Sequence, residues 1–208
     1  MKNRFTYLRS RPTSRGFSLI ELLVAVSIIA VISTALIFNY NTYAGHIELG
    51  NAANQVALDI REAQAFAMGV RATAGGQYPS YGIHFDQAAP AVYILYADLN
   101  QNQAYDIGGT CGTANSECVK VTTMPQKMKL KSLCGVTNPT TSSADCPGPL
   151  STSQYFDVHF IRPSSDAMIV GRPAGAPLVF STAEITITTA KGYTKTVAVA
   201  GTGQVVVR

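Results

Sequence analysis

The sequence contains no tryptophan and little charge, because only 13% of its 208 residues are Asp, Glu, Lys or Arg while 47% are hydrophobic. This balance excludes a chain that is disordered throughout, since such chains have too few apolar groups to form a core. Acidic residues are absent before residue 21, and five of the 16 basic residues lie there, which leaves eleven basic against twelve acidic groups in the rest. The near-neutral body therefore lacks the basic footprint by which nucleic-acid-binding proteins neutralise phosphates.

Catalytic motifs are also lacking. The sequence has neither a Gly-x-Ser-x-Gly element nor a phosphate-binding loop. The three histidines, His46, His84 and His159, are far apart and show no metal-ligand spacing. His84 and His159 lie in alternating segments, where we expect solvent-facing or hydrogen-bonded structural residues. The sequence therefore predicts a protein that is not an enzyme.

One long apolar run follows the basic N-terminus. Residues 17–38 include a single charge, Glu21, and no Pro or Gly. As a helix they would span roughly 33 Å, enough to cross a bilayer, and the preceding basic residues place the N-terminus in the cytoplasm. We expect a single-pass inner-membrane protein whose remainder is periplasmic or extracellular. A cleaved signal peptide is the alternative, although its best site, Thr42-Tyr43-Ala44, lies well beyond the run.

The start of this run is Arg15-Gly16-Phe17-Ser18-Leu19-Ile20-Glu21, which resembles the N-terminal signal of type IV pilins and type II secretion pseudopilins. The resemblance implies that residues 1–16 are a leader peptide, that prepilin peptidase cuts between Gly16 and Phe17, and that the same enzyme methylates the Phe17 amine. It also implies that Glu21, the fifth mature residue, neutralises the Phe17 amine of a neighbouring subunit in a helical filament. A carboxylate costs about 2.5–3.5 kcal/mol at the centre of a membrane helix, so we interpret Glu21 as an assembly residue that sets register.

Beyond residue 38, a helical pattern continues to about Ala74. Apolar residues recur at spacings of three and four, while charged residues, including Asp59 and Glu62, lie off this stripe. Gly75-Gly76 then ends the pattern. The sequence therefore predicts a transmembrane and filament-core helix over 17–38 and an amphipathic helix over 39–74 that packs on the following head.

The head, residues 75–208, is predicted to be mainly antiparallel β-sheet. Gly192-Tyr193 and Gly201-Thr202-Gly203 mark hairpin turns between the last three strands. The fold class is thus α+β, and its element order resembles the GspH/FimT branch of minor pilins and pseudopilins. The expected strands are Tyr81–Asp86, Ala91–Asp98, Val119–Met124, Met128–Leu133, Tyr155–Ile161, Ala167–Val170, Glu184–Thr189, Lys195–Val199 and Gln204–Val207.

Two other functions stay open as alternatives: a FimT-like DNA-binding competence pilin and a signal-anchored envelope protein. The resemblance associates DNA binding with a C-terminal Gly-Arg-x-Arg element, and the stretch from Gly203 to Arg208 lacks its first Arg. Lys127, Lys129 and Lys131 alternate, as on the solvated face of a protected edge strand. DNA is therefore not an expected partner; prepilin peptidase, other pilins and the membrane are.

All four cysteines, Cys111, Cys118, Cys134 and Cys146, lie in the part predicted to be exported. Export favours disulfides, and four cysteines allow three pairings. The nearest-neighbour pairing, Cys111 with Cys118 and Cys134 with Cys146, would close two surface loops and add about 2–3 kcal/mol each. A four-thiolate zinc site is the alternative, but the sequence has no Cys-x-x-Cys.

A polar segment places Asp98, Asn100, Asn102 and Asp106 at positions 1, 3, 5 and 9 of a calcium-type loop. Position 6 is Gln103 rather than Gly, and position 12 is Gly109 rather than Glu. The alternative is a turn in which these side chains bond to their own backbone. Calcium is the only candidate cofactor, and otherwise none is expected.

Overall fold

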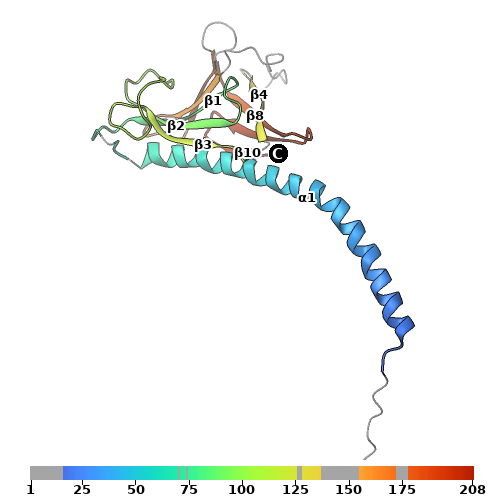
Figure 1. The fold of residues 1–208 in the computed structure, drawn as a ribbon. Coiled ribbons are helices and arrows are strands. Elements are labelled where there is room, and N and C mark those ends of the chain that lie inside the picture. Colours follow the sequence, from blue (N-terminus) through green and yellow to red (C-terminus); the bar gives the residue numbers. More distant parts are fainter. Residues whose placement is uncertain (1–15, 70, 74, 126–127, 137–154, 172–177) are drawn as a thin grey trace, which may run out of the picture. The chain divides into compact units, whose positions relative to one another are not determined.

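The structure, a computed structural model, describes residues 16–69, 71–73, 75–125, 128–136, 155–171 and 178–208 (Figure 1). The chain divides into two compact units, residues 1–43 and 44–208, and each is described by itself. Most of the expected leader, together with Lys127 and Cys146, lies outside the described residues.

The first unit contains the beginning of helix α1 (Leu19–Met68). Its segment Leu19–Ile37 is long and apolar enough to cross a membrane, and none of it is buried by other described residues. The hydroxyls of Ser27 and Thr34 each donate to the carbonyl oxygen four residues earlier, at 2.8 Å. These polar groups thus have partners inside the helix, as a lipid environment requires.

In the second unit, the C-terminal part of α1 packs against the β-sheets. Its buried face includes Leu49, Val56, Ile60 and several alanines, close to the predicted stripe. The helix ends at Met68, so the expected helical end near residue 74 was wrong. Gly69 follows directly, and glycine costs a helix about 1 kcal/mol relative to alanine. Its N–H closes the last turn on the carbonyl of Ala65 at 2.8 Å.

Within the described residues, ten strands form two sheets and every pairing is antiparallel. This confirms the α+β prediction. The six-stranded sheet has the order β3-β2-β1-β5-β6-β7 and the four-stranded sheet the order β10-β9-β8-β4. The strands are β1 (Ser80–Asp86), β2 (Val92–Asp98), β3 (Cys118–Thr123), β4 (Met128–Val136), β5 (Tyr155–Phe160), β6 (Ala167–Gly171), β7 (Leu178–Phe180), β8 (Thr182–Thr189), β9 (Thr194–Ala200) and β10 (Val205–Val207).

The expected strands all occur, with small shifts at their ends. The two glycine-containing turns connect β8 to β9 and β9 to β10, as expected. Strand β7 (Leu178–Phe180) is an additional strand that the sequence pattern did not predict. It has only three residues, which is too short for alternation to be recognised.

The core lies on one face of the six-stranded sheet. Tyr81, Ile83 and Phe85 of β1 point into it, together with Val158 and Phe160 of β5, apolar residues of α1 and residues of the four-stranded sheet. Because side chains alternate along a strand, the intervening residues of β1 and β5 lie on the opposite face. That second face carries buried polar groups.

Candidate functional site

The predicted processing site lies directly before the helix. Gly16, Phe17 and Ser18 are not helical, and α1 begins at Leu19. Apart from its chain neighbours, no described residue has an atom within 4 Å of the position that a Cβ would take at Gly16, and Phe17 is 81% exposed. Glu21 lies in the first helical turn, where the helix dipole favours an acidic group. The local structure leaves the peptide bond between Gly16 and Phe17 accessible. The roles of Gly16 in cleavage, Phe17 in methylation and Glu21 in assembly stay predictions.

The apolar segment that follows exposes large hydrophobic side chains around its circumference, among them Leu19, Leu23, Ile28 and Ile32. A helix that is apolar all round is stable only inside lipid or among other helices. None of this segment is buried by the residues that the structure describes. It therefore requires an apolar environment from outside the chain.

The calcium-type loop begins at the end of β2. Asp98 is buried, and its two carboxylate oxygens accept the backbone N–H groups of Asn102 and Gln103 at 3.1 and 3.0 Å. The side-chain oxygens of Asn100 and Asn102 accept N–H groups two residues further on, and both side-chain amides donate to Asp106. These contacts match the Asx-turn alternative. Calcium binding stays a prediction.

The loop between β2 and β3 is closed by a disulfide between Cys111 and Cys118, whose Cα atoms are 4.6 Å apart. A four-thiolate zinc site is therefore not formed. Cys134 is buried on β4, and no cysteine among the described residues is free. The second expected pairing involves Cys146, which lies outside the described residues.

The same loop lies over the second face of the six-stranded sheet, where two histidines each meet a carboxylate. Nδ1 of His84 is 2.7 Å from Oδ1 of Asp157, and Nε2 of His159 is 3.6 Å from Oδ2 of Asp98. From the loop, the Tyr105 ring contacts His84, with ring centroids 5.0 Å apart. All four polar residues are less than 9% exposed. Of the two alternatives expected for these histidines, the solvent-facing one is therefore wrong, and the hydrogen-bonded one is confirmed, because His84 bonds to Asp157 and Nδ1 of His159 lies 3.3 Å from the Tyr96 hydroxyl.

Gly82 makes this arrangement possible. It lies opposite Tyr96 on one side and opposite His159 on the other. A Cβ at Gly82 would come within 2.7 Å of the Tyr96 ring. Because glycine has no Cβ, the Tyr96 hydroxyl can lie 3.3 Å from Nδ1 of His159. The other ring nitrogen of His159 faces the Asp98 carboxylate, so His159 lies between Tyr96 and Asp98.

Acidification is expected to destabilise the protein through His159. Burial lowers the pKa of His159, and Asp98 opposes this shift only in part. An unfolded histidine titrates near pH 6.5, so as the pH falls through this value the unfolded chain takes up a proton that the folded chain does not. Urea unfolding should show a loss of up to about 1.4 kcal/mol between pH 7.5 and 5.5.

This contribution should be absent in His159→Gln and retained in His46→Gln, because His46 is exposed. Burial raises the pKa of Glu117. The folded protein therefore binds a proton at this carboxyl more readily than the unfolded chain does, so Glu117 stabilises the fold as the pH falls, opposite to His159 and at lower pH. Equal pH dependence in wild type and His159→Gln would contradict the prediction.

A further buried carboxylate joins α1 to the six-stranded sheet. Asp59 is only 3% exposed, and it accepts hydrogen bonds from the Tyr93 hydroxyl at 2.6 Å and from Nζ of Lys120 at 3.2 Å. Burial and this contact raise the pKa of Tyr93. The pKa of Lys120 is also raised, because Asp59 and Glu62 outweigh its desolvation. The expectation that Asp59 lies off the buried stripe was therefore wrong.

The basic residues considered for DNA binding are dispersed. Lys129 and Lys131 are exposed on β4, an edge strand of the four-stranded sheet, as the solvated-face interpretation predicted. Nη1 of Arg208 lies 3.6 Å from Oε1 of Glu184, and this carboxylate offsets the positive charge of Arg208. Lys127 is outside the described residues.

Comparison with known proteins gives a match at the N-terminus. Residues 11–37 match the family model described as the prokaryotic N-terminal methylation motif. No curated protein and no solved structure matches the chain. The matched region includes Gly16, Phe17, Glu21 and the exposed apolar segment of α1. The motif supports a type IV pilin-like protein: a membrane-anchored structural subunit that prepilin peptidase processes and that assembles with other pilins.

Proposed function

We propose that the protein is a minor pilin or pseudopilin of the GspH/FimT type, assembled into a type II secretion pseudopilus or a type IV pilus. One observation carries the proposal: the methylation motif includes the start of an apolar helix that the described part of the chain leaves uncovered. Cleavage after Gly16 on the cytoplasmic side would remove the leader but keep this helix, so that the product stays anchored.

The contribution of the helix is packing rather than catalysis. Leu19–Ile37 would form the filament core when neighbouring subunits replace lipid around it. Glu21 would meet the methylated amine of Phe17 on the next subunit, because a charge in an apolar environment costs several kcal/mol unless it is paired. The β head would supply lateral contacts.

The proposal predicts the N-terminus of the mature protein. After co-expression with a prepilin peptidase, mass spectrometry of the N-terminal peptide should find a chain that starts at Phe17 and carries one methyl group on its amine. Gly16→Leu should leave most of the protein uncleaved, because the side chain obstructs the peptidase.

Gly45→Leu is the matched control, since at both glycines the Cβ position is more than 4 Å from every described atom outside the chain neighbours and the adjoining helix backbone. It should be processed like wild type. A mature chain that starts at Gly45 would indicate a conventional signal peptide, and an uncut Met1 would indicate a signal anchor; either result contradicts the proposal.

A further inference from the structure

Lysines gather at one end of the four-stranded sheet. The start of β4 pairs with the end of β8, and the turn over 190–193 connects that end of β8 to the start of β9. After residue 16 the sequence has eleven basic and twelve acidic residues, so this cluster does not reflect a generally basic head. We call it the lysine end, and its four exposed members are Lys129 and Lys131 on β4, Lys191 in the turn and Lys195 on β9.

The lysine end lies beside the first turns of α1 in the second unit. Tyr193, next to the turn, places its ring over His46 of α1, with ring centroids 4.0 Å apart. Further along α1, Asp59 contacts β2 and β3, and Arg61 contacts β10. The lysine end is therefore the part of the head that contacts α1 nearest to its apolar segment.

The chain limits how far the lysine end can be from a membrane. His46 follows Ile37, the last residue of the apolar segment, by nine positions in one helix. Nine helical residues span about 14 Å, and this covalent limit holds for any angle between the two units. A headgroup layer is roughly 5–8 Å thick. His46 thus lies within about 9 Å of the headgroup surface, which is close to the Debye length at physiological salt.

The chemistry of this end suits a negatively charged lipid surface. Lysines next to such a surface are attracted to its phosphates, and Glu48, an exposed acid on the same part of α1, can offset one of the four charges at most. Tyr193 adds an aromatic ring of the kind that lies at membrane interfaces. Because the anchor holds the lysine end beside the bilayer, docking is intramolecular and needs no dissolved partner.

We propose that the lysine end docks on anionic phospholipid headgroups of the membrane that anchors the protein, until the subunit enters a filament. The inference rests on the membrane anchor of the proposed function and not on the choice between pilus and pseudopilus. Entry into a filament would then have to break these contacts as well as remove the helix from lipid.

Amine labelling of the full chain in nanodiscs tests this inference. One set of discs contains phosphatidylcholine alone, and the other an equal mixture with phosphatidylglycerol. Mass spectrometry gives the acetylation rate of each lysine, and the four members of the lysine end should react at least about tenfold more slowly in the anionic discs. Salt at about 1 M, where the Debye length is about 3 Å, should remove this protection. Lys120, which Asp59 and Glu62 hold beside α1, should react equally in both discs.

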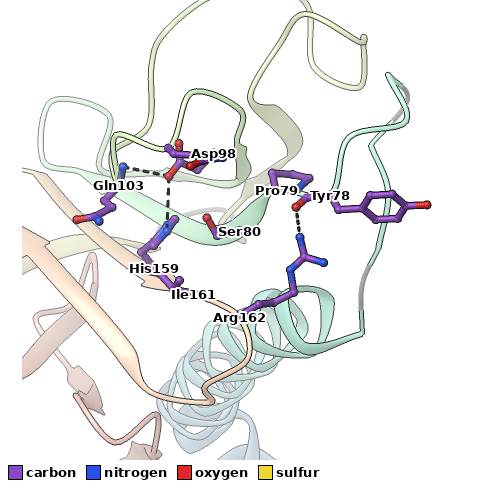
Figure 2. Close-up of a pocket in the computed structure, with 9 residues that line it drawn as sticks. Tyr78, Pro79, Ser80, Asp98, Gln103, His159, Ile161 and Arg162 are labelled. Atoms are coloured by element: carbon purple, nitrogen blue, oxygen red, sulfur yellow. Dashed lines mark hydrogen bonds and ion pairs between the residues drawn. The ribbon is translucent and has the colours of Figure 1, made fainter.

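The double variant Lys191→Gln with Lys195→Gln should lower the protection of Lys129 and Lys131 by up to about thirtyfold, the value of two lysines near an anionic surface. The matched control is Arg71→Gln with Arg162→Gln, which also removes two positive charges. Arg71 stacks on Phe66, and Arg162 donates to the Tyr78 carbonyl (Figure 2), so both lie outside the lysine end. This control should retain the protection.

Three results would overturn the inference alone: equal labelling of the lysine end in both discs, an equal slowing of Lys120, or full protection in the double lysine variant. Protection that occurs in filaments but not in anionic discs would assign the lysine end to an acidic face of a neighbouring subunit instead. Failure of the chain to co-purify with either disc would contradict the membrane anchor itself, and with it the proposed function.

Discussion

Glu21→Gln is expected to be cleaved and methylated normally but to fail to enter a filament. Glu21 is the only charged residue between Arg15 and Glu48, and it lies in the first turn of a helix whose apolar side chains are uncovered. Glutamine keeps the shape and removes the charge, so the Phe17 amine of the neighbouring subunit would be buried without a counter-ion. Breaking a buried ion pair costs about 3–5 kcal/mol, which corresponds to at least a hundredfold loss of incorporation.

Immunoblotting of sheared filaments against the membrane fraction measures this effect. Glu48→Gln is the matched control, because Glu48 is an exposed glutamate on the same helix, and it should be incorporated as wild type is. If Glu21→Gln entered filaments at the wild-type level, Glu21 would have no role in register, and the assembly part of the proposed function would fail.

The features that the sequence predicted well depend on neighbouring residues. The methylation motif is one continuous stretch, residues 11–37, and a membrane-spanning helix is recognisable from an uninterrupted apolar run. The turns at Gly192 and Gly203 have positive φ angles of 86° and 80°, which glycine adopts without strain. The hairpins around them could therefore be placed without knowledge of the rest of the fold.

The buried polar pairs could not be predicted in this way. His84 and Asp157 are 73 positions apart, and they meet because β1 and β5 are neighbours in the sheet although three strands separate them along the chain. Alternation left His84 and His159 as either solvent-facing or hydrogen-bonded residues, because it could not show that the loop between β2 and β3 covers their face of the sheet. Asp59 was missed for the same reason, since its partners Tyr93 and Lys120 lie on β2 and β3.

These pairs connect the packing of the head to its proposed role. The second face of the six-stranded sheet would be an open surface without the loop between β2 and β3. The loop is fixed there by the Cys111–Cys118 disulfide and by Glu117, whose carboxylate accepts the backbone N–H groups of Leu99 and Asp106. A subunit that makes lateral contacts in a filament needs such a fixed surface, and the polar pairs beneath it favour one arrangement of the loop.

Asp157→Val is expected to destabilise the folded head by about 3–5 kcal/mol, because it leaves His84 buried without its carboxylate partner. The two side chains are 9% and 0% exposed, so water cannot readily replace the lost contact. Urea unfolding of the full chain, followed by tyrosine fluorescence since tryptophan is absent, measures the change. Asp166→Val, at an exposed aspartate, is the matched control and should change stability by less than about 0.5 kcal/mol.

The double variant His84→Phe with Asp157→Val separates loss of the pair from loss of packing. Phenylalanine keeps a ring against Tyr105 and Tyr155, whose centroids lie 5.0 and 5.4 Å from that of His84. Because neither buried polar group then remains without its partner, the double variant should recover most of the stability that Asp157→Val loses. If the double variant were as unstable as Asp157→Val, the cost would come from the strand itself, and the pair would not be what holds this face of the sheet.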